Sequence, residues 1–258
     1  MSQAKYLNYQ VEGTAGKPAL LLLNSLGTNL HMWDAQMDAL APHFQVVRMD
    51  TRGHGRSFVS PLPFTLADLG QDVLAVMDEL ELEHAHVCGI SMGGLTALWM
   101  GIYAPQRIHK LVVANSAAKI GTAEGWLGRA TQVLSSGAAA MQQLAQSAPQ
   151  RWFTTAFTQQ HPLRIQALCE QLALTSPQGY AACCKALADA DLRMAVHQIQ
   201  APLCVIAGNA DPVTTTTDAR YIVERAQHSH LVELDASHLS NVEQAEAFNT
   251  ALIQFLSN

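Results

Sequence analysis

Short apolar runs alternate with helix-like segments along most of the chain, and this alternation constrains the fold more than any other feature. Each run is bounded by turn-forming residues, and the runs are 19–23, 44–49, 86–88, 111–114, 203–207 and 231–234. Buried parallel strands are nearly continuous apolar runs, and each needs a long crossover, usually a helix, to reach its neighbour. We therefore predict an α/β fold with a mostly parallel sheet flanked by helices. Residues 6–11 are expected to add an antiparallel edge strand, and residues 65–81 a helix capped by Thr65.

The segment 118–190 interrupts this alternation. It is rich in Ala and Gln, and it holds several helical patterns without a strand-like run. An insertion of this length between two strands is expected to form a helical cap over one end of the sheet. The predicted organisation is therefore a core of residues 1–117 and 191–258, with a cap of residues 118–190.

Composition limits the possible partners. The 258 residues are 49% hydrophobic, only 14% charged, and carry a formal net charge of -6, so we expect one large domain that binds neither nucleic acid nor a membrane. The first residues lack an apolar run flanked by positive charge, which predicts a cytoplasmic protein. The five cysteines are an odd number and are expected to be reduced, mostly buried thiols. Composition alone favours no particular oligomeric state.

Ser91 stands in a Gly-x-Ser-x-Gly frame that begins at Gly89 and ends at Gly93. Such a frame recurs by chance in roughly one chain of this length in ten, so its context matters. A strand-like segment precedes it and a helix-like segment follows it. A sharp strand-to-helix turn needs residues without side chains, and it lifts the serine hydroxyl above the sheet edge. The pattern favours a nucleophile, with Met92 N–H at the helix N-terminus as an oxyanion donor; the alternative is a glycine-rich turn with an idle serine.

A serine nucleophile needs a base, and the base needs an orienting acid. Asp211 follows the run 203–207, and His238 follows the run 231–234. Each residue alone has a structural alternative, because Asp-Pro often opens turns and the chain has eleven histidines. Their positions after two successive strands, in the order Ser, Asp, His, favour a catalytic triad. Asp218 and Asp235 are weaker candidates for the acid.

Three other histidines carry less weight. His84 and His86 alternate on one strand-like segment, but two ligands without a third make a weak metal site, so no metal is predicted. His54 lies in the segment DTRGHGRS, which is interpreted as a polar, glycine-rich connection. None of the three is assigned to catalysis.

The order of motifs resembles that of a known family. LLLNSLGTNLHMWD, DTRGHGRS, GISMGGLTALWM, ANSAAKIGTAEGW, AGNADPVT and ASHLSNVEQ together resemble the 3-oxoadipate enol-lactonases of the α/β-hydrolase superfamily. The resemblance implies an α/β-hydrolase fold, no cofactor, and hydrolysis of a small cyclic enol ester to 3-oxoadipate in aromatic-compound (β-ketoadipate) catabolism. Haloperoxidase-like esterases and carbon-carbon bond hydrolases are similar by motif, whereas Ser91 argues against dehalogenases and epoxide hydrolases, which carry Asp there.

One departure concerns the loop after the run 19–23. Many members of the superfamily have His-Gly there, whereas this chain has Asn24 and Ser25 before Leu26. The resemblance implies Leu26 N–H as the second oxyanion donor, and a backbone donor survives a change of side chains. Asn24 and Ser25 are interpreted chiefly as residues that tie down the loop, with a substrate contact as the alternative.

The resemblance also implies an anionic substrate, so an arginine is expected in an otherwise apolar pocket. Arg151 beside Trp152 is our first choice, and Arg129 near Trp126 is the second; the alternative is that these arginines are solvated or bind helix ends.

Two other functions stay open. One is a general small-ester hydrolase or cofactor-free perhydrolase with the same triad, and the other is a catalytically silent module that binds a ligand.

Overall fold

The structure is a computed structural model, and it describes residues 3–61 and 63–257. Its sheet has the strand order β1-β3-β2-β4-β5-β6-β7, in which β1 is antiparallel to β3 and every other neighbouring pair is parallel. The strands are β1 Tyr9–Gly13, β2 Ala19–Leu23, β3 Gln45–Met49, β4 Ala85–Ile90, β5 Ile108–Ala114, β6 Leu203–Gly208 and β7 Ser229–Leu234. The predicted α/β fold is confirmed, because each apolar run forms a strand.

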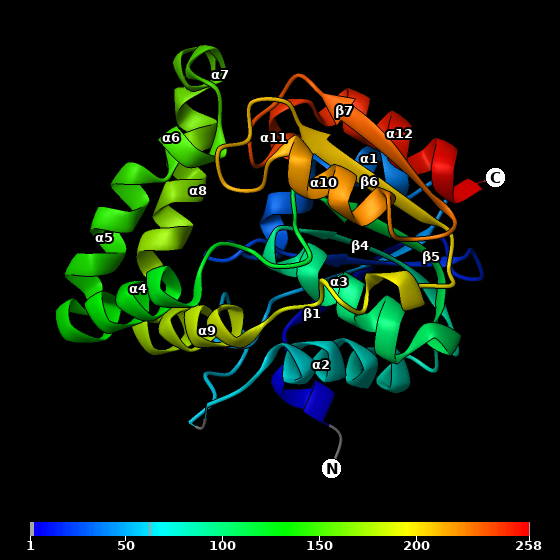
Figure 1. Cartoon of the computed structure of the whole chain (residues 1–258), viewed down its shortest axis with the longest axis horizontal. Helices are drawn as coiled ribbons and strands as arrows, with labels where there is room; N and C mark the ends of the chain where they lie inside the picture. Colours follow the sequence, from blue (N-terminus) through cyan, green and yellow to red (C-terminus); the bar gives the residue numbers. More distant parts are fainter. Residues whose placement is uncertain (1–2, 62, 258) are drawn as a thin grey trace.

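Helices cover both faces of the sheet. In Figure 1, α2 and α3 lie on one side of the strands, and α1 and α12 lie on the other. The helices outside the β5–β6 connection are α1 Asp34–Leu40, α2 Leu66–Glu79, α3 Met92–Tyr103, α10 Thr216–Val223, α11 Ser240–Glu243 and α12 Ala245–Ser257. Short 3-10 helices are formed by Gln3–Tyr6, Leu30–Trp33, Pro105–Arg107 and Val196–Gln198.

The regular structure between β5 and β6 consists only of helices. The α-helices there are α4 Ala123–Ser136, α5 Ala138–Ser147, α6 Pro149–Trp152, α7 Thr155–Gln160, α8 Pro162–Leu174 and α9 Pro177–Asp189. Figure 1 shows these helices gathered at one side of the sheet. Helix α4 packs against α9, and α5 packs against α8, so the insertion has packing of its own.

Two predicted boundaries shift. The edge strand begins at Tyr9 rather than Tyr6, which ends a 3-10 helix. Helix α2 ends at Glu79, because the backbone of Glu81 has a φ of 55°, which lies outside the right-handed helical region. The cap on this helix is as predicted: Thr65 and Asp68 form a reciprocal capping box. No helix within the described residues is long and apolar enough to cross a membrane.

Candidate active site

Ser91 occupies a strained turn between β4 and α3. Its φ of 56° and ψ of -116° lie where residues other than glycine are rarely found. The turn brings backbones so close that a Cβ on Gly89 would lie 2.2 Å from Gly93 O, and one on Gly93 would lie 2.3 Å from Leu23 O. Both glycines of the frame are therefore required by close approach, as the sequence predicts, and the turn places the buried Ser91 side chain in a pocket at the end of β4.

Asp211 and His238 meet beyond the ends of β6 and β7. Asp211 Oδ2 lies 2.8 Å from His238 Nδ1, and both side chains are buried. The contact fixes the tautomer, because the carboxylate accepts the Nδ1 proton and leaves Nε2 free to act as a base. Asp211 Oδ1 accepts hydrogen bonds from the amides of Val213 and Thr214. Burial raises the pKa of Asp211, but the charge of His238 and hydrogen bonds from His238, Asn115 and Val213 outweigh it and hold the pKa below its usual value.

The two weaker candidates for the acid lie elsewhere. Asp218 is the third residue of α10 and forms a capping box with Thr215, from whose amide it accepts a hydrogen bond. Asp235 is exposed and accepts a hydrogen bond from Asn209. Neither lines the pocket that contains Ser91 and His238.

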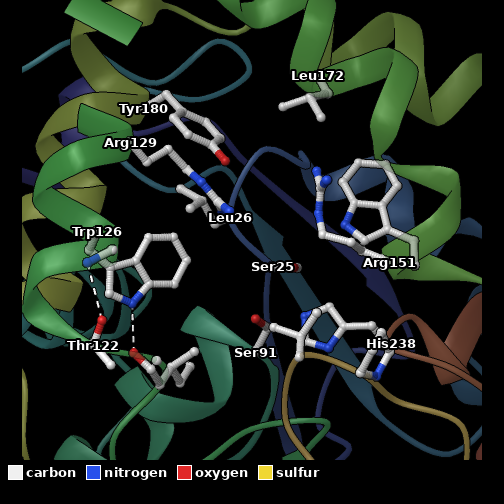
Figure 2. A pocket seen from close by; sticks show the side chains of 16 residues that line it. Ser25, Leu26, Ser91, Thr122, Trp126, Arg129, Arg151, Leu172, Tyr180 and His238 are labelled. Carbon is white, nitrogen blue, oxygen red and sulfur yellow. Dashed lines mark hydrogen bonds between the residues drawn. The ribbon is translucent and has the colours of Figure 1, made fainter. Parts of the chain in front are cut away.

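The pocket has a volume of about 300 Å³ and lies between the carboxyl ends of the strands and the helical insertion. Ser91 and His238 lie together in Figure 2, while Trp126, Arg129 and Tyr180 project from α4 and α9, and Arg151 lies across from them. Its lining residues are Ser25, Leu26, Ser91, Ile120, Gly121, Thr122, Gly125, Trp126, Arg129, Arg151, Trp152, Leu172, Tyr180, Pro212, Val213 and His238. The predicted contacts Trp126, Arg129, Arg151 and Trp152 are thus all brought to one cavity.

Two backbone amides are available near the serine. Leu26 lines the pocket, and Met92 is the first residue of α3. Among residues 3–61 and 63–257, neither amide donates a hydrogen bond. A helix N-terminus and an unused loop amide beside a nucleophile are suited to stabilise an oxyanion.

The loop after β2 is held by its polar side chains. Asn24 donates to Met49 O at 2.8 Å and accepts from Trp33 Nε1 at 2.9 Å, so both ends of its amide group are bonded within the protein. This agrees with the interpretation that Asn24 ties down the loop. Ser25, in contrast, lines the pocket.

The two pocket arginines differ in their partners. Arg151 donates from Nη1 to Ser147 O and Oγ and, from Nη2, to Leu144 O, all near the end of α5. Arg129 instead lies with Cζ 4.9 Å from the centre of the Trp126 ring. Burial, together with the like charge of Arg129, lowers the pKa of Arg151 from its usual value. No Asp or Glu is among the described residues that line the pocket, so two cations share it without an acidic partner.

Three residues near the site were not singled out as functional from the sequence. Tyr180 lines the pocket, and burial raises its pKa to about 12, so its hydroxyl stays protonated. Asn115 donates from Nδ2 to Asp211 Oδ2 at 3.0 Å. His54, interpreted as part of a polar connection, accepts a hydrogen bond from Gly27 N at 3.0 Å. Only Asn115 had a sequence signal, because it directly follows a strand-like run.

Metal chemistry has no candidate site in the described part of the chain. No group of three or more His, Cys, Asp or Glu residues is arranged to hold a metal ion there. His84 and His86 both lie near His109, whose ring centre is 4.5 Å from that of His84. This cluster is at the start of β4 and β5, at the opposite end of the sheet from the pocket.

The fold and the pocket define an α/β hydrolase. The profile of the alpha/beta hydrolase fold family matches residues 18–245, and the chain belongs to that family. Its sequence is 47% identical to 3-oxoadipate enol-lactonase 2 and 48% identical to 3-oxoadipate enol-lactonase 1, both of Acinetobacter baylyi. Each comparison covers 246 residues, 95% of this chain and 91% of the relative.

A solved structure agrees with these relatives. The crystal structure of the enol-lactonase from Burkholderia xenovorans LB400 superposes with a TM-score of 0.95 at 38% identity, over 98% of this chain and 96% of that one. The resemblance to 3-oxoadipate enol-lactonases is therefore confirmed over nearly the whole chain.

Proposed function

We propose that this protein hydrolyses 3-oxoadipate enol-lactone to 3-oxoadipate in the β-ketoadipate branch of aromatic-compound catabolism. The observation that carries the proposal is that one pocket contains Ser91 and His238 together with Arg129 and Arg151. The first pair supplies acyl-transfer chemistry, and the second supplies positive charge for a small anionic lactone. Similarity to the two Acinetobacter baylyi enol-lactonases supports this substrate.

The reaction begins with acylation. His238 Nε2 takes the proton of Ser91 Oγ as the oxygen attacks the lactone carbonyl, and Asp211 stabilises the resulting imidazolium. The amides of Leu26 and Met92 donate to the tetrahedral oxyanion. Collapse of this intermediate breaks the ring C–O bond and expels an enolate. The enolate takes up the proton that His238 holds, which returns His238 to its neutral form, and the resulting enol becomes a ketone that cannot close the ring again.

Deacylation uses the same groups. His238 Nε2 removes a proton from water, the hydroxide attacks the acyl carbonyl, and the amides of Leu26 and Met92 again hold the oxyanion. Ser91 then leaves with a proton from His238, which releases 3-oxoadipate. No cofactor takes part in these reaction steps.

Arg129 is the stronger candidate for the substrate carboxylate. Arg151 already donates to the end of α5, whereas Arg129 lies against the Trp126 ring and shares a hydrogen bond with Tyr180, another residue of the pocket. Trp126 and Trp152 would then pack against the apolar part of the substrate. These contacts support Arg129 ahead of Arg151, although the sequence alone favoured Arg151.

The helices between β5 and β6 fit the role of a cap. We assign residues 118–190 to a cap that closes the pocket, and residues 1–117 and 191–258 to the hydrolase core. Ile120, Trp126 and Arg151 support this division, because the insertion supplies them to the pocket. The five cysteines are free thiols, as suits a cytoplasmic location.

The decisive experiment follows opening of the enol-lactone by the wild type and by Ser91→Ala. The variant should lose turnover by several orders of magnitude and keep its melting temperature within a few degrees. Unchanged turnover in the variant would contradict the serine mechanism. Failure of the wild type to open the enol-lactone, while it still hydrolyses neutral aryl esters, would instead support a general esterase.

The anion contact needs a separate set of variants. Arg129→Met should raise KM for the lactone by roughly 10-fold to 100-fold, because a charge-assisted hydrogen bond is lost, and leave KM for a neutral aryl ester unchanged. Arg164→Met is the matched control, because Arg164 lies on the exposed side of α8 outside the pocket. Equal effects on both substrates would argue against a carboxylate contact.

A further inference from the structure

The turn formed by residues 25–28 carries Leu26, the proposed oxyanion donor that does not belong to α3. Thr28 N donates to Ser25 O at 3.2 Å and closes the turn. Gly27 sits at its third position with a φ of 82°, the left-handed conformation that a type II turn requires there. All functional consequences of this turn depend on which way its peptide groups point.

The direction of the Leu26 N–H is set by the carbonyl of Ser25. The two groups belong to one planar trans peptide, so they point in opposite directions. Ser25 O accepts from both the amide of Thr28 and its Oγ1, the latter at 2.8 Å. The Thr28 hydroxyl also lies 2.9 Å from Met32 Sδ, but a carbonyl oxygen is the stronger acceptor. Because two Thr28 donors hold the Ser25 carbonyl, the Leu26 N–H points away from Thr28.

His54 holds the next peptide of the turn. Gly27 N donates to His54 Nε2 at 3.0 Å, and this bond opposes rotation of the peptide between Leu26 and Gly27. Because Nε2 accepts, the ring proton is on Nδ1, which lies 3.3 Å from Arg52 O. Burial lowers the pKa of His54 to about 4, so the ring is neutral and able to accept at neutral pH.

Both side chains are buried, Thr28 with 2% and His54 with 1% of its surface exposed. Neither lines the pocket, so neither is placed to touch substrate. We infer that Thr28 and His54 are positioning residues that aim the Leu26 N–H at the oxyanion. This inference rests on the hydrolytic function proposed above. It predicts that both residues act on the transition state and raise kcat without contributing to substrate affinity.

Matched variants separate the hydrogen bonds from simple packing. Thr28→Val keeps the branched shape and loses the hydroxyl, whereas Thr28→Ser keeps the hydroxyl. His54→Met removes both ring nitrogens, whereas His54→Gln offers an acceptor where Nε2 stands. His54→Asn offers a donor toward Arg52 O but no acceptor for Gly27. If His54→Met fails to fold, the Gln and Asn variants still decide the question.

Two rates are measured for each variant. The first is steady-state turnover of the enol-lactone. The second is the rate at which a fluorophosphonate modifies Ser91, since this reaction also builds negative charge on an oxygen held by the two amides but does not need the lactone contacts. Thr28→Val, His54→Met and His54→Asn should lower kcat and the labelling rate roughly 10-fold to 100-fold, with KM nearly unchanged. Thr28→Ser and His54→Gln should stay within about threefold of the wild type.

Other outcomes overturn the inference. Equal rates for Thr28→Val and Thr28→Ser, whether high or low, would show that the hydroxyl does not aim the turn. Equal rates for His54→Asn and His54→Gln would do the same for Nε2. A wild type that is labelled at Ser91 but does not open the enol-lactone would contradict the proposed substrate only, because the labelling rates of the variants still decide this inference.

Discussion

Asn115 Nδ2 donates a 3.0 Å hydrogen bond to Asp211 Oδ2, the same oxygen that lies 2.8 Å from His238 Nδ1. Asn115 follows β5 and has a φ of 43°, a conformation that asparagine tolerates better than most residues. Its Nδ2 also donates to Ser237 O, and its Oδ1 accepts from Ser240 Oγ. One buried amide therefore connects the acid of the proposed triad to both sides of the loop that carries His238.

Asn115→Ala should lower kcat about 10-fold or more, because Asp211 loses a donor and the loop that carries His238 loses two contacts. Asn115→Asp should be worse, since it places a second carboxylate beside Asp211. The measurement is lactone turnover per Ser91 labelled by a fluorophosphonate. Asn209→Ala is the matched control, because Asn209 forms a similar pair with exposed Asp235. Equal losses at Asn115 and Asn209 would refute this role.

Gly93→Ala should prevent stable folding or lower the free energy of unfolding by several kcal/mol. Its Cβ would lie 2.3 Å from Leu23 O, which is backbone in a central strand and cannot move aside. Gly128→Ala in α4 is the control, because nothing lies within 4 Å of that Cβ, and it should stabilise the protein by up to about 1 kcal/mol. Urea unfolding compares the two variants. A Gly93→Ala protein as stable as the wild type would contradict the turn geometry.

Much of the fold was predictable because local signals agree with the tertiary structure. The apolar runs form strands, and Ser91, Asp211 and His238 could be selected because each follows a strand at one sheet edge. The contact between His54 and Gly27 could not be predicted in this way. It joins two loops that are far apart in sequence, and it depends on which ring nitrogen carries the proton. The preference for Arg129 over Arg151 likewise needed the positions of the carbonyls at the end of α5.

His86 makes stability depend on acidity. Burial lowers its pKa to about 4, with smaller effects from His109 and Lys110, and its Nδ1 has no hydrogen-bond partner among the described residues. In the unfolded chain its pKa is near the ordinary histidine value of 6.5, so between pH 6.5 and 4 the unfolded state binds more protons. The stability that the neutral ring contributes is therefore lost as pH falls through this window.

His86→Leu should remove this dependence and relieve an unsatisfied buried nitrogen. Relative to the variant, the wild type should lose about 2–3 kcal/mol of unfolding free energy between pH 7 and pH 4. His54, which also has a pKa of about 4, is present in both proteins, so its effect cancels in the difference. Urea unfolding at several pH values measures it. Parallel pH curves would rule out His86 as the titrating group.

Arg52 and Asp72 form a buried bidentate ion pair, with Arg52 Nε and Nη2 at 2.6 and 2.7 Å from the carboxylate oxygens. The guanidinium also lies near the rings of Phe58 and Phe64. Arg52 thereby anchors the start of the loop that carries His54. Because both charges are out of water, removing one partner leaves the other uncompensated.

Arg52→Met should lower the free energy of unfolding by about 3–5 kcal/mol, since it leaves the Asp72 carboxylate buried without its guanidinium. Adding Asp72→Leu should recover most of this loss, because an apolar pair replaces the charges. Arg220→Met is the control, as Arg220 pairs with Glu233 at the surface, and it should cost less than about 1 kcal/mol. Urea unfolding of the single and double variants gives the coupling directly. A double variant no more stable than Arg52→Met would mean that Arg52 acts mainly through its ring contacts and backbone bonds, and not through the charge of Asp72.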